Sequence, residues 1–146
     1  MSKLFRRGLD DIGVGTVCVC HDGQGNVLLQ KRASSRKIEP GKWDVVGGTL
    51  ERGLTLVENV KKEIREEYGA KVKKVNFLGY REVIDVHAWR DQHWLAMDFV
   101  AEIARGSEKI GEPDKVSEIG WFPKDNLPKP LHFTMKDYIK KNWNKF

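Results

Sequence analysis

The chain has 146 residues, of which 40% are hydrophobic and 32% charged, and its formal net charge at pH 7 is +5. No apolar run approaches the ~20 residues that a membrane-spanning helix needs, and the basic N-terminus is not followed by the apolar core of a signal peptide. We therefore expect a cytoplasmic protein. Residues 1–146 should form a single domain, which is large enough to bury a hydrophobic core.

The excess positive charge lies at the two ends of the chain. Residues 124–146 carry six lysines and two aspartates, and residues 1–10 carry three basic residues and one aspartate. A nucleic-acid-binding domain more often has a basic stripe mixed with aromatic residues on its central elements. We therefore expect neither a nucleic acid polymer nor a membrane as partner, although the basic ends could attract a small polyanion. The oligomeric state is left open.

The first half of the chain predicts a hairpin followed by a loop. Residues 13–20 are apolar and β-branched, which favours a strand, and residues 22–26 have turn composition. Residues 27–32 then form the returning strand. A polar loop over residues 33–42 leads to a short strand at residues 43–46.

A helix is predicted after Gly47 and Gly48, which we interpret as a turn. Thr55 is a favourable N-cap and Gly69 a favourable residue just beyond the C-terminus. Apolar residues recur every four positions between them, so this helix has one face directed to the core.

The second half predicts strands and one more helix. The predicted elements are a strand at 71–85 with a bend at Gly79, a turn at 88–92, a strand at 93–103, a loop at 106–115, a strand at 118–122 and a helix at 131–143. A mixed sheet with a helix on each side follows from this order.

Three glutamates of the first helix form the strongest chemical signal. Glu63, Glu66 and Glu67 stand at i, i+3 and i+4, so they share one helical face. Carboxylates so close to one another repel, and hard divalent cations prefer clustered oxygen ligands. This helix therefore predicts a site for Mg²⁺, with Mn²⁺ as the alternative.

The stretch from Gly47 to Ala70 resembles the signature of the Nudix hydrolases, also called the MutT family. In that signature a glycine is followed at set intervals by a glutamate, an Arg-Glu pair, a Glu-Glu pair and a second glycine. Leu54 stands where the family has its first glutamate, and Lys62 stands where it has arginine. The remaining positions match in register: Gly48, Glu63, Ile64, Glu66, Glu67, Gly69 and Ala70.

The resemblance implies an α/β/α sandwich with a mixed central sheet and a metal-dependent hydrolase. Its expected substrate is a nucleoside di- or triphosphate or another nucleoside diphosphate derivative, whose pyrophosphate linkage is cleaved by attack of water at phosphorus. Residues 27–32 also look like the strand that precedes the substrate loop in this family, and residues 40–48 match the usual approach to the signature. The resemblance implies Glu63 as base, Lys62 as the residue that orients the carboxylates, and Gly47, Glu63, Glu66 and Glu67 as metal ligands. In this family a late loop often supplies a further carboxylate, for which the candidates are Glu108, Glu112, Asp114 and Glu118, and Glu112 fits best by its position before Pro113. Arg32 and Trp43 are the expected substrate-binding residues.

Two alternatives remain beside a nucleotide pyrophosphohydrolase. Leu54 and Lys62 also fit a catalytically weakened domain that binds a nucleotide or a partner. An isopentenyl-diphosphate isomerase-like enzyme is disfavoured, because Val45, Val46 and Gly47 stand where that branch has a cysteine. For stacking on a base, the sequence offers Trp89, Trp94 and Trp121 in addition to Trp43.

Overall fold

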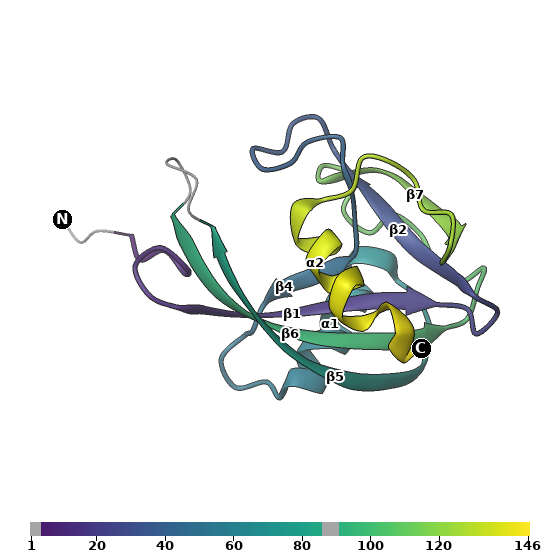
Figure 1. The fold of residues 1–146 in the computed structure, drawn as a ribbon, viewed down its shortest axis with the longest axis horizontal. Helices are drawn as coiled ribbons and strands as arrows, with labels where there is room; N and C mark the ends of the chain where they lie inside the picture. Colours follow the sequence, from purple (N-terminus) through teal and green to yellow (C-terminus); the bar gives the residue numbers. More distant parts are fainter. Residues whose placement is uncertain (1–3, 86–90) are drawn as a thin grey trace.

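The computed structural model describes residues 4–85 and 91–146, and it shows a sheet covered by one helix on each face (Figure 1). The predicted turn at 88–92, together with Trp89, lies largely outside the described residues. No helix of the described ranges is long and apolar enough to cross a membrane. Along the chain the elements are β1 (Gly13–His21), β2 (Asn26–Arg32), β3 (Trp43–Asp44), β4 (Val46–Thr49), α1 (Leu56–Tyr68), β5 (Val72–Asp85), β6 (Gln92–Ile103), β7 (Val116–Pro123), α2 (Phe133–Asn142) and the 3₁₀ turn η1 (Trp143–Lys145).

The sheet is mixed, as predicted, and β1 lies at its centre. The strand order is β3-β2-β1-β6-β5, with β4 paired to β1 and β7 paired to β2. On one edge β1 runs parallel to β6, while its other edge changes partner along its length. Gly15–Cys18 pair with β4, and only Cys20 and His21 pair with β2. This change of partner separates β4 from β2 beside the middle of β1.

The sequence signals at both ends of α1 are confirmed. The Thr55 hydroxyl accepts a hydrogen bond from the Glu58 amide at 3.2 Å, and the Glu58 carboxylate accepts one from the Thr55 amide at 3.0 Å. Gly69 ends the helix in the left-handed conformation with φ 58°. The buried face of α1, which includes Val60 and Ile64, packs on the face of β1 that carries both cysteines.

Helix α2 covers the opposite face of the sheet, in front of β1 in the view of Figure 1. Met135 and Tyr138 pack against Val19, which alternates with the two cysteines along β1. The helix begins at Phe133 rather than at Leu131, because Leu131 forms a β-bridge with Trp43. His132 caps its N-terminus by accepting a hydrogen bond from the Thr134 amide at 3.1 Å.

The expected turn at Gly47 and Gly48 is wrong, since both residues lie within β4 and pair with β1. Their glycine identity has a different physical reason, which is close approach. A Cβ atom at Gly47 would lie 3.0 Å from the Thr16 carbonyl oxygen, and one at Gly48 would lie 2.5 Å from the Glu63 carboxylate. Glycine therefore allows α1 to bring Glu63 directly against β4.

Candidate active site

A cavity of about 580 Å³ lies where β4 and β2 separate beside β1. Its walls come from both sides of the sheet centre. The middle of β1, β4 and the glutamate face of α1 line one part, the end of β2 and the loop after it line a second, and β5, β6 and the start of α2 line a third. Residues distant in sequence therefore share one space of a size typical of small-molecule sites.

All four predicted carboxylates line this cavity. Glu63, Glu66 and Glu67 project from α1, and Glu112 comes from the loop before β7. The structure thus brings together the carboxylates that the sequence suggested as metal ligands. Gly47, whose carbonyl was predicted as a further ligand, lines the same cavity from β4.

Glu112 reaches the cavity because its loop docks on the end of α1. The Lys109 amide donates to the Tyr68 carbonyl at 2.7 Å, and the Gly111 amide donates to the Glu67 carbonyl at 2.9 Å. These bonds satisfy carbonyls that a helix end leaves without partners. A Cβ atom at Gly111 would overlap the Glu66 carbonyl oxygen, so the approach requires glycine. The sequence pointed to Glu112 through its loop, but nothing local marked Gly111.

Glu67 is the most deeply buried of the four carboxylates, with 8% of its surface exposed. Its Oε1 accepts a hydrogen bond from Gln30 Nε2 at 2.8 Å, and the same Gln30 nitrogen donates to the Val45 carbonyl at 3.2 Å. Glu67 Oε2 is buried without a hydrogen-bond partner among the described residues. Burial raises the pKa of Glu67 to about 9, with Glu63 and Glu112 adding to the shift and Gln30 opposing it.

Glu63 is half-buried between α1 and β4. Burial raises the pKa of its carboxyl group, and the Glu66 and Glu112 charges act in the same direction. The charge of Lys62 opposes the shift. A carboxyl group held in this way readily accepts a proton, as a general base must.

Lys62 lies among three carboxylates. Its Nζ is 3.0 Å from Glu66 Oε1, 3.4 Å from Glu51 Oε2 and 3.9 Å from Glu63 Oε1. The hydrogen bond to Glu66 is the main cause that raises the pKa of Lys62. Leu54, at the position of the family's first glutamate, has no carboxylate, and Glu51 supplies one beside Lys62 instead.

The loop that carries Glu51 is fixed by a buried asparagine that the sequence did not mark. Asn59 Oδ1 accepts a hydrogen bond from the Glu51 amide at 3.0 Å, and Asn59 Nδ2 donates to the Thr16 hydroxyl at 2.8 Å. The side chain of Asn59 is fully buried. It therefore ties this loop and α1 to the central strand.

The donor set fits a hard divalent cation, although the side chains are not gathered around one point. Within residues 4–85 and 91–146, no group of three or more His, Cys, Asp or Glu side chains is arranged to hold a metal ion. Glu66 is held by Lys62, and Glu67 by Gln30. The buried and unpartnered Glu67 Oε2, however, lies among carboxylates whose repulsion a cation would relieve.

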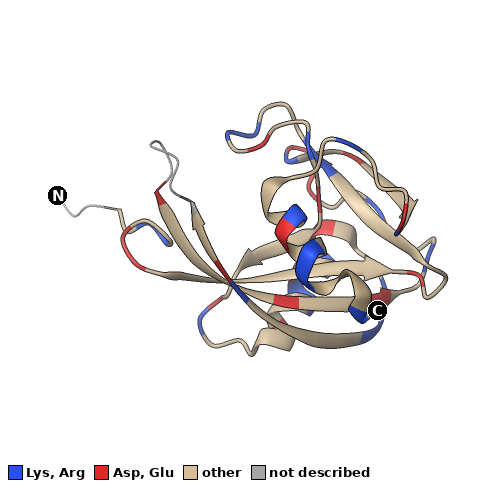
Figure 2. Cartoon of the chain, viewed as in Figure 1, with Lys and Arg blue, Asp and Glu red and all other residues tan. Residues whose placement is uncertain are grey.

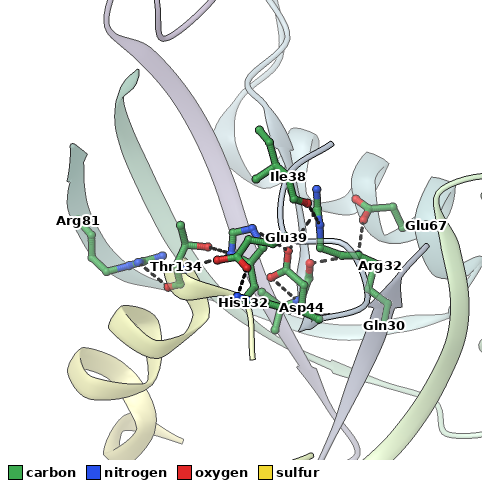
Figure 3. A network of polar contacts seen from close by, with 11 residues as sticks. Gln30, Arg32, Ile38, Glu39, Asp44, Glu67, Arg81, His132 and Thr134 are labelled. Atoms are coloured by element: carbon green, nitrogen blue, oxygen red, sulfur yellow. Dashed lines mark hydrogen bonds and ion pairs between the residues drawn. The ribbon is translucent and has the colours of Figure 1, made fainter. Parts of the chain in front are cut away.

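A polar network runs from β2 to α2 along the cavity wall (Figure 3). Arg32, predicted to bind substrate, lines the cavity and donates through Nε to the Ile38 carbonyl at 2.8 Å. Its Nη1 is 3.5 Å from Asp44 Oδ2, and His132 Nε2 is 4.0 Å from the same oxygen. Burial lowers the pKa of Arg32, and the Asp44 carboxylate opposes this shift. The network holds the Arg32 guanidinium in one orientation.

Trp43, also predicted to bind substrate, lies in the core instead. Only 6% of its surface is exposed, and its ring packs edge-on against Phe122 with the centroids 5.0 Å apart. It packs in the core cluster on the α2 side of the sheet, with Met135 and Tyr138, and is not part of the cavity lining. Trp94 lines the cavity from β6, and its indole donates to Gln92 Oε1 at 2.7 Å.

Arg81 is a cavity residue that the sequence analysis missed. It forms a buried two-pronged ion pair with Asp98, with Nε–Oδ2 at 2.7 Å and Nη2–Oδ1 at 3.0 Å. Its Nη1 donates to the Thr134 carbonyl at 3.0 Å (Figure 3). The available signal was Asp98, a carboxylate with three apolar residues on each side of it in the strand. This pair joins β5 and β6 to the start of α2.

A comparison against protein families identifies the family of this chain. A model described as the NUDIX domain matches residues 11–141. The chain belongs to the Nudix family. Its predicted family, its fold and its assignment as a Nudix pyrophosphohydrolase are thereby confirmed. This family hydrolyses pyrophosphate bonds in nucleoside derivatives and generally uses divalent metal ions.

Several relatives of this Nudix chain have assigned activities. It is 30% identical to the NAD-capped RNA hydrolase NudC of Stutzerimonas stutzeri over 105 residues, which is 72% of this chain and 35% of that protein. It is 28% identical to the nucleoside triphosphatase NudI of Enterobacter sp. over 116 residues, which is 76% of this chain and 82% of that protein. The chain therefore spans about a third of the length of the NudC relatives that it matches.

Solved structures agree on the fold. A MutT NUDIX hydrolase from Burkholderia pseudomallei superimposes with a TM-score of 0.79 at 30% sequence identity, covering 90% of this chain and 98% of that one. The NUDIX domain of Shewanella oneidensis NrtR, solved in complex with ADP ribose, has a TM-score of 0.72 at 23% identity. That comparison covers 97% of this chain and 90% of the other, and it shows the shared fold.

Proposed function

We propose that this Nudix protein hydrolyses a nucleoside di- or triphosphate to the nucleoside monophosphate with Mg²⁺ as cofactor, Mn²⁺ being the alternative. The observation that carries the proposal is the convergence of four carboxylates, from α1 and from the loop before β7, in one cavity of about 580 Å³. A space of this size accommodates a nucleotide. The similarity to the nucleoside triphosphatase NudI, of which the chain covers 82%, favours a free nucleotide as substrate.

Glu63, Glu66, Glu67, Glu112 and the Gly47 carbonyl would hold the cation. When bound, it would neutralise the non-bridging phosphate oxygens, polarise phosphorus and lower the pKa of bound water. Oxygen ligands from carboxylates and a backbone carbonyl are those that Mg²⁺ prefers.

Glu63 would accept the proton of the attacking water. The water oxygen forms a bond to phosphorus, the bond from phosphorus to the bridging oxygen breaks, and the proton passes to the Glu63 carboxylate. Its half-buried position and raised pKa suit a group that must take up a proton near neutral pH. Lys62 would hold Glu63 and Glu66 in the required orientation, and Arg32 would bind a phosphate oxygen.

The two departures from the family pattern reduce turnover in this proposal rather than abolish it. A lysine keeps the charge of arginine but not its planar fork, so it holds two carboxylates less rigidly. Leu54 provides no carboxylate, but Glu51 lies 3.4 Å from Lys62 and partly replaces it. Neither position contributes an oxygen to the proposed metal site.

Chromatography of the products tests the proposal directly. Nucleoside di- and triphosphates are incubated with the protein and Mg²⁺, and we expect the nucleoside monophosphate together with phosphate or pyrophosphate. The Glu67→Gln variant is the control for contaminating phosphatases, and we expect its turnover to be lower by several orders of magnitude. Hydrolysis of ADP-ribose or a sugar nucleotide, with nucleoside triphosphates left intact, would show that the substrate class is wrong.

The second candidate function is binding of a nucleotide or partner without efficient cleavage. It is favoured by one observation, which is that no three carboxylates of the described residues are arranged around a common metal position. Lys62→Arg combined with Leu54→Glu separates the two candidates. A wild type that turns over briskly rules out the binding module, whereas an inactive wild type that becomes active in the double variant supports it.

A further inference from the structure

Five basic side chains line the cavity, and four of them lie beside a carboxylate. The pairs are Arg32 with Asp44 at 3.5 Å, Arg81 with Asp98 at 2.7 Å, Lys115 with Glu112 at 3.4 Å and His132 with Asp44 at 4.0 Å. Arg36 is the fifth. In the described parts of the chain, no carboxylate lies within ion-pair distance of Arg36, and none of its guanidinium N–H groups has a hydrogen-bond acceptor.

Arg36 is not a freely exposed surface arginine, because its loop is attached at several points. The loop after β2 is held by hydrogen bonds from the Ala33 amide to the Lys115 carbonyl at 2.9 Å and from the Arg36 amide to the Ala33 carbonyl at 3.0 Å. The Ser35 hydroxyl also donates to the Asp114 carbonyl at 3.4 Å. The loop after β2 is thus joined to the segment that carries Glu112. Figure 2 shows basic residues, in blue, on the loop after β2.

The charge of Arg36 acts on the neighbouring Arg32. After burial, it is a further cause that lowers the pKa of Arg32, so the two positive charges lie near each other, while the Asp44 and Glu39 carboxylates oppose the shift. An anion that enters the cavity would relieve this repulsion. A guanidinium has five N–H donors in a planar fork that matches the oxygens of a phosphate group.

The order of the strands determines which part of a nucleotide meets Arg36. Trp94, which offers a ring for a base, forms an apolar side of the cavity with Val83 and Leu95 on β5 and β6, on one side of β1. Arg36 belongs to the loop after β2, on the other side of β1. The carboxylates of α1 stand between these two walls, because α1 packs on β1 and β4. A nucleoside on the apolar side therefore directs its phosphate chain toward Arg36.

We propose that Arg36 binds the terminal phosphate of the substrate and favours nucleoside triphosphates over diphosphates. The inference rests on the proposed function for the identity of the ligand. Arg36 does not touch the reacting atoms in this arrangement, so it determines affinity and substrate preference rather than the rate of the chemical step. Charge-assisted hydrogen bonds of this kind are worth about ten- to hundredfold in binding.

Arg36→Ala tests the inference, with Lys37→Ala as the matched control. Lys37 is the next residue of the same loop, is exposed and does not line the cavity, so its removal deletes one positive charge without touching the site. Binding of inorganic tripolyphosphate is measured by calorimetry with Mg²⁺ present. We expect Arg36→Ala to weaken it about ten- to hundredfold, Arg36→Lys to weaken it less, and Lys37→Ala to leave it within about twofold.

Steady-state kinetics give a second readout. In Arg36→Ala we expect KM for a nucleoside triphosphate to rise about tenfold or more with kcat nearly unchanged, and KM for the diphosphate to rise much less. Equal losses for the two substrates would overturn the placement at the terminal phosphate. The inference would be overturned if the wild type did not bind tripolyphosphate, or if Arg36→Ala did not weaken this binding. In either case, hydrolysis of a nucleoside triphosphate by the wild type would still support the proposed function. Arg36-dependent binding without hydrolysis would support the inference and reject the proposed function.

Discussion

Burial of Glu67 predicts that the metal-free protein loses stability as the pH rises, and that Glu67→Gln removes this loss. The pKa of Glu67 is about 9 in the folded protein against an ordinary value of 4.5, so between these two pH values the folded state binds more protons than the unfolded state. Stability is therefore highest near and below pH 4.5 with respect to this group, and it falls as the pH rises toward 9. Glutamine has nearly the same shape, retains an oxygen for the Gln30 amide and does not titrate.

The size of the effect follows from the shift. Each pH unit in this window removes up to about 1.4 kcal/mol, so the free energy of unfolding of the wild type should fall by up to about 3 kcal/mol between pH 5 and pH 7 relative to the variant. For a chain of this length, 1 kcal/mol corresponds to roughly 2–4 °C in Tm, so the difference reaches several degrees. Coupling to Glu63 and Glu112 makes this an upper estimate.

Thermal unfolding in the presence of a chelator measures the pH-dependent difference in stability between the wild type and Glu67→Gln. The melting temperatures of wild type, Glu67→Gln and the control Glu66→Gln are recorded at pH 5, 6, 7 and 8. Glu66 stands on the same helix, but 47% of its side chain is exposed. We expect the Tm of Glu67→Gln to rise relative to the wild type with increasing pH, and Glu66→Gln to remain parallel to the wild type. Parallel curves for Glu67→Gln would refute the argument that burial keeps this carboxyl group protonated.

Three further predictions concern turnover. Lys62→Arg should leave kcat equal or raise it a fewfold, because a planar fork orients two carboxylates better than a point charge does; a clear decrease in steady-state assays would contradict the positioning role. Gly111→Ala should destabilise the protein by about 1–3 kcal/mol in denaturant titrations and lower kcat at least about tenfold, since the added Cβ would displace Glu112 from the cavity. Glu112→Gln should lower kcat as much as Gly111→Ala does, but it should not lower the stability of the protein. Because the basic chain ends attract polyanions, kcat/KM should fall as NaCl is raised from about 10 to 300 mM, and a flat profile would remove long-range steering from the account.

The local sequence was sufficient to determine α1 and the carboxylate face that it carries. Its two ends depend on contacts within a few residues, the Thr55–Glu58 capping box and the left-handed Gly69, so they can be inferred without knowledge of the rest of the chain. The spacing of Glu63, Glu66 and Glu67 sets their common face by helical geometry alone. The mixed sheet also followed, because the apolar strand patterns recur in an order that admits few arrangements.

Only the tertiary structure decided how the remaining site residues are placed. Gly47 and Gly48 have the composition of a turn, and they lie in a strand because β1 and Glu63 approach them closely. Trp43 and Trp94 look equally suited to stacking, yet Trp43 packs in the core on the α2 side of the sheet while Trp94 lines the cavity. The burial of Glu67 against Gln30, the docking of Gly111 on α1 and the Arg81–Asp98 pair each join segments 17 to 44 residues apart. Such contacts depend on which strands pair and in which register, and no short stretch of sequence contains that information.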